Sequence, residues 1–176
     1  MVPFRTSGEK PALFCACAGG GDALDYRDLA LALPADQPVY AFGLPDLGGS
    51  QQFPTVQELA AIYVRKVRER QEQGPYRLCG HSFGGLVVYE MAVLLENAGL
   101  EVDLLALLDT LHPRTVRAFQ LVNRRSFNPP IFLTVLLSMG GIWWVAGSAA
   151  WRQYIPSKYD GLLVLCNASD RTPSIV

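Results

Sequence analysis

The stretch CGHSFGG, residues 79–85, decides the fold. It places Ser82 between Gly80 and Gly84, directly after the short apolar run at residues 76–79. At a strand-to-helix turn of this kind the backbone segments approach so closely that small residues are needed on both sides of the serine. The turn also lifts the serine hydroxyl above the sheet. The stretch therefore predicts a nucleophilic serine, with an ordinary glycine-rich turn as the alternative.

The residues on both sides of this stretch alternate short apolar runs with helical patterns over the first 111 positions. Such alternation is typical of a parallel sheet with crossover helices. We expect strands at residues 12–17, 39–42, 76–79, 104–108 and 161–166. We expect helices at residues 26–33, at residues 86–95 and in the segment that starts after Thr55. That last helix begins with a Thr55–Glu58 capping box, and we expect Gly74 and Pro75 to stop it.

Composition limits the classes of protein that the chain can belong to. The chain has 176 residues, half of them apolar and 18% charged, with a net charge of −1. These values predict one globular domain and give no indication of a nucleic-acid surface or of disorder. The N-terminus has no apolar signal segment and the four cysteines lie in apolar runs, so we expect a cytoplasmic protein. Cys15 and Cys17 are interpreted as small core residues rather than as a metal or redox site.

Residues 74–110, GPYRLCGHSFGGLVVYEMAVLLENAGLEVDLLALLDT, resemble the thioesterase domain that ends many nonribosomal peptide synthetases and polyketide synthases. They are also similar to the stand-alone editing thioesterases of those pathways. Residues 11–33 and 154–170 match the same family. The resemblance implies an α/β-hydrolase fold: a mostly parallel sheet with flanking helices and an apolar lid insertion. It implies a single thioesterase domain over residues 1–176, with the last helix, strand and histidine loop missing.

The resemblance also assigns the catalytic acid. The family's acid lies at the end of the strand after the elbow helix, and Asp109 occupies that position, 27 residues after Ser82. In many other hydrolases of this fold the acid follows the next strand, which would make it Asp170. A strand-end aspartate can also serve only as a helix cap or turn residue. We expect Asp109 to be the acid, with Asp170 as the alternative.

Two backbone amides are expected to form the oxyanion hole. The amide of Phe83, at the start of the helix after the serine, can face a developing oxyanion. The resemblance places the second donor in the loop after the first strand, at Gly19. Many relatives carry His-Pro or His-Gly in that loop, where this chain has Cys17 and Ala18. Because the donor is a backbone amide, the chemistry can survive the change.

A catalytic base is the part of the triad that the sequence does not supply. The family's histidine follows a last strand far downstream of the acid, whereas this chain contains only His81 and His112. We expect His81 to be packed beside the elbow and to point away from Ser82. His112, three residues after Asp109, could substitute as the base, but with Pro113 it is interpreted as the start of the lid. The base is therefore not expected in this chain.

Residues 113–153 are expected to form the lid or acyl-pocket insertion. Within them, residues 126–151, from Ser126 to Trp151, carry no charge and are long enough to span a bilayer. Paired prolines and glycines interrupt the run, and a lid over an acyl chain must also be apolar inside. We therefore favour the lid, and the membrane span is the minority alternative.

The predicted function is release of an acyl or peptidyl chain from the phosphopantetheine arm of a carrier protein, through an acyl-enzyme on Ser82. The carrier protein is the expected partner, and no metal or redox cofactor is expected. One alternative is a small-molecule esterase or lipase of the same fold. Another is a catalytically dead binding module that has lost its histidine. We also expect residues 161–166 to form an open edge strand whose backbone groups have no partner.

Overall fold

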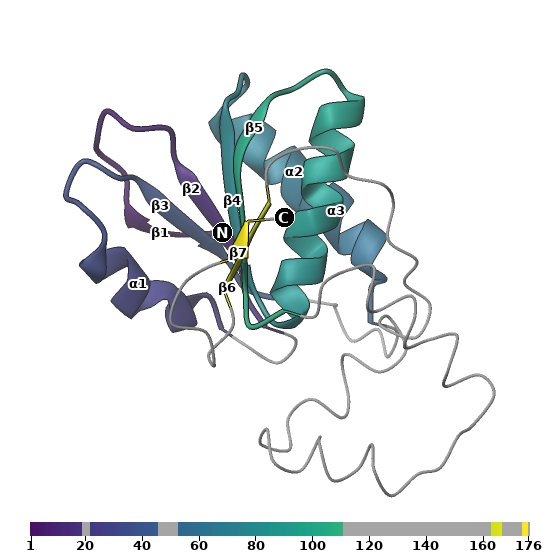
Figure 1. The fold of residues 1–176 in the computed structure, drawn as a ribbon, viewed down its shortest axis with the longest axis horizontal. Helices are drawn as coiled ribbons and strands as arrows, with labels where there is room; N and C mark the ends of the chain where they lie inside the picture. The colour runs from purple at the N-terminus through teal and green to yellow at the C-terminus, as the bar shows by residue number, and fades with distance from the viewer. Residues whose placement is uncertain (19–21, 46–52, 111–162, 167–173, 176) are drawn as a thin grey trace, which may run out of the picture.

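The computed structural model describes residues 1–18, 22–45, 53–110, 163–166 and 174–175 (Figure 1). These residues form one seven-stranded sheet with the order β1-β3-β2-β4-β5-β6-β7. The strands are β1 (Val2–Arg5), β2 (Leu13–Ala16), β3 (Val39–Phe42), β4 (Tyr76–His81), β5 (Val102–Leu108), β6 (Leu163–Cys166) and β7 (Ser174–Ile175). The helices are the 3₁₀ turn η1 (Ala23–Tyr26), α1 (Arg27–Ala32), α2 (Val56–Arg70) and α3 (Phe83–Asn97).

The centre of the sheet is parallel, as the alternating pattern predicts. β2 pairs with β3 and β4, β4 with β5, and β5 with β6, all in parallel register. Only β1 and β7, at the two edges of the described sheet, are antiparallel to their neighbours. Because parallel strands share a carboxyl edge, the residues that follow β2, β4 and β5 meet at one edge of the sheet.

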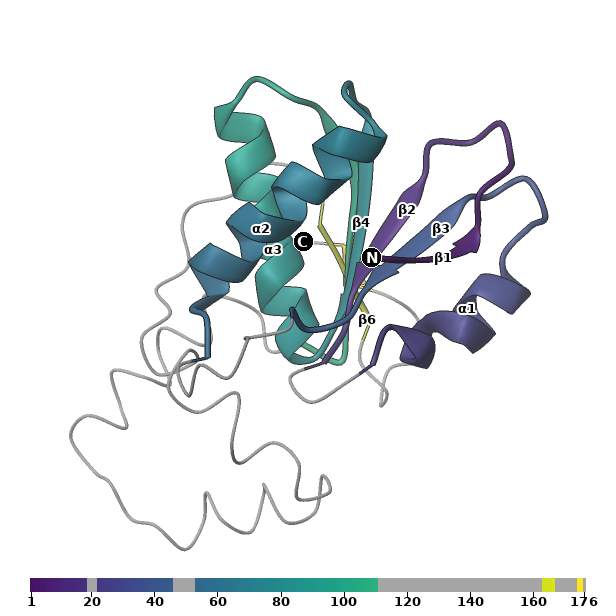
Figure 2. The ribbon, with the colours of Figure 1, turned by 180° about the vertical axis from the view of Figure 1, so that it is seen from behind.

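Helices cover both faces of the sheet. α2 and α3 lie together on one face and α1 lies on the other (Figures 1 and 2). α3 is buried nearly all round, in agreement with its mainly apolar composition. Its face of the sheet carries the larger core, in which Phe42 of β3 stacks on Tyr63 of α2 with ring centroids 4.4 Å apart. The smaller core on the α1 side contains Cys15 and Cys79.

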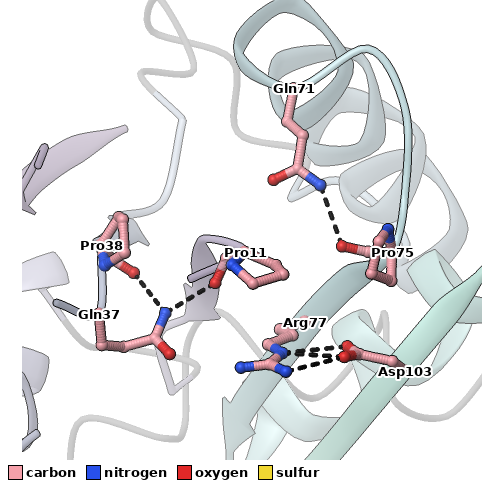
Figure 3. Close-up of polar contacts among 7 residues, drawn as sticks. All are labelled: Pro11, Gln37, Pro38, Gln71, Pro75, Arg77 and Asp103. Carbon is pink, nitrogen blue, oxygen red and sulfur yellow. Dashed lines mark hydrogen bonds and ion pairs between the residues drawn. The ribbon is translucent and has the colours of Figure 1, made fainter. Parts of the chain in front are cut away.

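An ion pair joins β4 to β5 near their amino ends. Arg77 and Asp103 approach to 2.9 Å, and the guanidinium donates to both carboxylate oxygens (Figure 3). This contact helps to hold the register in which His81, at the other end of β4, lies beside Leu108 of β5. The register determines which residues meet at the carboxyl edge.

The predicted start of α2 is confirmed, but its predicted end is wrong. Thr55 and Glu58 form the capping box, with both reciprocal hydrogen bonds present. The helix ends at Arg70, because Gln71 already has extended backbone angles. Gly74 is therefore no helix cap. It belongs to a connecting turn in which the Gln71 side chain donates to the carbonyl oxygen of Pro75, as Figure 3 shows.

Both edge strands were missed by sequence reasoning, and one of them corrects the expected open edge. β7 pairs with β6 through Val164↔Ile175 and Leu165↔Ser174, so part of the outer edge of β6 has backbone partners. Leu163 is buried and Val164 is half-buried. A two-residue strand leaves no recognisable period in the sequence, and its pairing comes only from tertiary contact.

Candidate active site

Ser82 occupies the sharp turn between β4 and α3. Its φ of 56° and ψ of −116° lie outside the regions that most residues with a side chain adopt. Such a conformation costs free energy and persists only where the surroundings enforce it. The side chain makes no capping hydrogen bond to α3, and the residue is half-buried. The geometry is that of the predicted strand–elbow–helix.

Three glycines around the serine allow this turn to form. A Cβ at Gly80 would overlap the carbonyl oxygen of Gly84, and a Cβ at Gly84 would overlap the carbonyl oxygens of Ala16 and Cys17 at the end of β2. A Cβ at Gly85 would overlap the side chain of Thr110. The prediction that small residues are needed on both sides of Ser82 is therefore supported by specific backbone contacts.

The elbow is bonded directly to the end of β5. The amide of Ser82 donates to the carbonyl oxygen of Leu108 at 2.9 Å. Asp109 follows Leu108 with a left-handed φ of 48° and is exposed to solvent. The next residue, Thr110, is buried, and its hydroxyl lies 3.1 Å from the carbonyl oxygen of Ser82 and 3.0 Å from that of Leu108. Ser82 and Asp109 therefore leave the sheet at the same edge, on neighbouring strands.

Tyr26 connects the elbow to the end of β2. Its hydroxyl donates to the carbonyl oxygen of Ala16 at 2.6 Å and accepts from the amide of His81 at 2.8 Å. The ring is buried, with 4% of the residue exposed. Burial is the main cause that raises the pKa of Tyr26 far above its ordinary value, so the hydroxyl stays protonated.

Sequence reasoning missed both Tyr26 and Thr110 as residues of the site. Thr110 had a usable signal, because it is a polar residue directly after a buried strand and beside the predicted acid. Tyr26 had only a weak one, since an aromatic residue in the first turn of a helix is ordinary. Its two hydrogen-bond partners lie 10 and 55 residues away in sequence.

The expectation that His81 is packed beside the elbow is wrong, because the residue is exposed. It is the last residue of β4, at the carboxyl end of the strand. Gly19, His112 and Asp170 all lie outside the described residues, as do the predicted lid, residues 113–153, and the candidate span, residues 126–151. The roles predicted for them stay predictions.

Phe83 is the first residue of α3, as the predicted oxyanion donor must be. The first amides of a helix have no partner within the helix, and the helix dipole is positive there. The Phe83 side chain is buried and meets Phe53 edge to face, with ring centroids 6.2 Å apart. This packing anchors the residue whose backbone amide is the candidate donor.

Three cysteines, Cys15, Cys17 and Cys79, are buried free thiols. They form no disulfide. Burial, followed by the charges of Asp25 and Asp22, raises the pKa of Cys17 from 9.0 to about 11. A thiol with so high a pKa is a poor nucleophile at neutral pH. Over the described residues, no group of three or more His, Cys, Asp or Glu side chains is arranged to hold a metal ion.

A family model for the thioesterase domain matches residues 11–150, which include the elbow and both predicted triad members, Ser82 after β4 and Asp109 after β5. The chain belongs to the thioesterase domain family. The match also extends over most of the predicted lid region. The resemblance inferred from the sequence around Ser82 is thereby confirmed at the level of the family.

Curated relatives of this thioesterase domain are synthetases of much greater length. The chain is 42% identical over 110 residues to the dimodular nonribosomal peptide synthase of Bacillus subtilis (strain 168), a match that covers 62% of this chain and 5% of the relative. It is 41% identical over 111 residues to malpibaldin synthetase of Mortierella alpina, covering 62% of this chain and 2% of that protein. The chain thus corresponds to a small part of the length of these relatives.

Solved structures confirm the α/β-hydrolase fold. The NocB thioesterase domain, crystallised as a covalent complex with a fluorophosphonate nocardicin G analog, has a TM-score of 0.69 and 31% identity, over 90% of this chain and 73% of that chain. The type II thioesterase YbtT of the yersiniabactin pathway has a TM-score of 0.63 at 21% identity, over 97% of this chain and 79% of that one, and this likeness shows the fold alone. None of the helices in the described ranges has the length and apolar character that crossing a membrane requires.

Proposed function

We propose that this thioesterase domain takes an acyl or peptidyl chain from the phosphopantetheine arm of a carrier protein onto Ser82. The Ser82 oxygen attacks the thioester carbonyl carbon, the C–S bond breaks, and the pantetheine thiol leaves with the proton that came from the serine. Water or a nucleophile within the acyl chain then releases the product. The amides of Phe83 and Gly19 hold the oxyanion, and Asp109 orients the histidine that carries the proton.

One observation carries the proposal: the strained Ser82 elbow is bonded through its own amide to Leu108, the residue before Asp109. This bond supports the proposal because it holds Ser82 and Asp109 at one edge of the sheet, beside the first amides of α3. A serine in an ordinary glycine-rich turn is not expected to combine a positive φ with three closely packed glycines around it. The fluorophosphonate complex of the NocB domain supports a reactive serine in a related protein.

The relatives support the carrier protein as the partner. One of them is a nonribosomal peptide synthase. In such synthases substrates travel on carrier domains, and the phosphopantetheine belongs to that carrier. Residues 113–153 are the proposed lid over the acyl chain, and the cytoplasm is the proposed location. No bound metal or redox group is part of the proposal.

Neither histidine of the chain is proposed as the base. His81 directly precedes Ser82, and its backbone amide is held by Tyr26. His112 is assigned to the start of the lid. A nucleophile without its base retains a residual rate of about 10³ to 10⁴ over water in triad enzymes, because the oxyanion hole and binding remain. Acyl transfer to Ser82 is therefore expected to be slow and measurable in residues 1–176 alone.

Acyl transfer from a thioester tests this function. The chain is incubated with a medium-chain acyl-pantetheine thioester, thiol release is followed, and the acyl adduct is mapped by peptide mass spectrometry. We expect an adduct on Ser82, lost in Ser82→Ala and kept in Ser7→Ala, a variant of an exposed serine far from the elbow in sequence. Faster reaction with the matching simple alkyl ester favours the esterase alternative. Binding of the acyl-pantetheine with no adduct favours the dead binding module.

A further inference from the structure

The end of β2 and the end of β4 are held together by a side chain instead of a backbone hydrogen bond. The described β2–β4 pairing ends at Ala16↔Gly80. Beyond it, the Tyr26 hydroxyl lies between the carbonyl oxygen of Ala16 and the amide of His81, at 2.6 Å and 2.8 Å. The Tyr26 hydroxyl thus donates its proton to β2 and accepts a hydrogen bond from β4.

Both strands that Tyr26 connects end at the elbow. His81 is followed by Ser82 and Phe83, whose amide is the proposed donor on the elbow side. Ala16 is the last residue of β2, and its carbonyl oxygen lies against Gly84 in the first turn of α3. The Tyr26 hydroxyl therefore links these two chain segments directly.

A second contact between the same segments lies at Gly84. The absence of a Cβ there lets the first turn of α3 rest against the carbonyl oxygens of Ala16 and Cys17. Cys17 is itself held on its other side, because its amide donates to the carbonyl oxygen of Phe42 at 3.2 Å. The end of β2 is thus packed between β3 and the elbow, and Tyr26 supplies the polar link on the elbow side.

We propose that Tyr26 is a positioning residue for the oxyanion hole, because its hydroxyl sets the elbow amide of Phe83 in place relative to the end of β2. The inference rests on the proposed function of Ser82. Tyr26 touches neither substrate nor reacting atoms in this role. It acts through the backbone of His81 and of Ala16, and its buried ring fixes where the hydroxyl lies.

Tyr26→Phe keeps the buried ring and removes only the hydroxyl that bonds Ala16 and His81. A displacement of about 1 Å in a catalytic constellation can lower a rate by about 10²-fold. We therefore expect the rate constant for fluorophosphonate labelling of Ser82 to fall by about tenfold or more. The amide resonances of Ser82 and Phe83 should shift, and the His81 amide should exchange faster with deuterium because it has lost its acceptor.

Tyr76→Phe is the matched control. Tyr76 is a fully buried tyrosine at the other end of β4, and its hydroxyl donates to the carbonyl oxygens of Gln71 and Glu72 at 3.0 Å and 2.8 Å. Its loss should leave the labelling rate and the elbow resonances unchanged. Equal slowing in both variants would mean a general loss of stability and would overturn the positioning role. So would wild-type labelling and unshifted Ser82 and Phe83 resonances in Tyr26→Phe.

A second variant covers the case in which Tyr26→Phe does not fold. Tyr26→3-fluorotyrosine keeps the ring and the hydroxyl but weakens the oxygen as an acceptor. A shifted His81 amide resonance with slower labelling supports the proposal, and an unshifted His81 resonance overturns it. If Ser82 of the wild-type chain does not react at all, the proposed function fails. The Phe83 and His81 resonances still decide the positioning role of Tyr26 in that case.

Discussion

The amide of Ser82 donates a 2.9 Å hydrogen bond to the carbonyl oxygen of Leu108. The bond links the turn after β4 to the turn after β5, and each turn contains a residue with a left-handed φ, Ser82 and Asp109. Neither conformation is favourable for a residue with a side chain, and such conformations persist only where surrounding contacts enforce them. The proposed nucleophile and the proposed acid are therefore held by one shared piece of backbone structure.

Thr110 is expected to stabilise this arrangement through its hydroxyl. Thr110→Val keeps the shape but removes the donor to the carbonyl oxygens of Ser82 and Leu108, so we expect a loss of about 1 to 3 kcal/mol in the free energy of unfolding. Thr110→Ser keeps the hydroxyl and loses one methyl group, at a cost of about 1 kcal/mol. Urea denaturation compares the two. A smaller loss for valine than for serine would contradict the hydrogen-bonding role.

Gly85 is expected to tolerate no side chain. A Cβ there would overlap the buried Thr110 side chain, so Gly85→Ala should lower the free energy of unfolding by about 1 to 3 kcal/mol and slow the labelling of Ser82. Gly43→Ala is the control, because a Cβ there meets Ala23 only at ordinary contact distance, 3.6 Å. Thermal unfolding of the two variants makes the comparison. Equal melting temperatures would show that the elbow can open to admit a methyl group.

The sequence predicts a feature of this fold where residues close together in the chain determine that feature. The elbow at Ser82 and the capping box at Thr55 were predicted correctly, because each is determined by residues a few positions apart. β1 (Val2–Arg5) was missed. It forms by antiparallel pairing with β3, almost forty residues later, and the pairing has no signature in four residues.

The site shows the same division. Asp109 was placed correctly at the end of a strand beside Ser82, because the apolar run before it marks the strand end. The two hydrogen bonds of the Tyr26 hydroxyl could not be predicted, because they depend on how far apart the ends of β2 and β4 lie. The exposure of His81 was also mispredicted, because burial at the last residue of a strand depends on how far the covering helices extend.

The acid is tested by exchanging carboxylate for amide. In a preparation that turns over an acyl-pantetheine thioester, Asp109→Asn should lower kcat by about 10⁴-fold and leave folding intact, because asparagine favours the wrong histidine tautomer. Asp170→Asn should have little effect. Steady-state kinetics with circular dichroism as the folding control distinguish the two. The reverse result would place the acid one strand further along the sheet.

The raised pKa of Cys17 predicts a loss of stability at alkaline pH. Its pKa is 9.0 ordinarily and about 11 in the folded chain, so above pH 9 the unfolded state loses a proton that the folded state retains. The stabilisation is complete below pH 9 and is lost as pH rises to about 11, by up to about 2 to 3 kcal/mol. Urea unfolding at pH 8 and pH 10.5 should therefore show a smaller decrease for Cys17→Ala than for the wild-type chain. Equal decreases would contradict the raised pKa.

Ser82 itself is tested by covalent labelling of residues 1–176. The chain is treated with a fluorophosphonate, and the adduct is located by peptide mass spectrometry in the wild-type chain and in Ser82→Ala. We predict slow modification confined to Ser82, and none above background in Ser82→Ala. Modification spread over several serines, at the same rate in both proteins, would show that the strained turn at Ser82 holds no nucleophile.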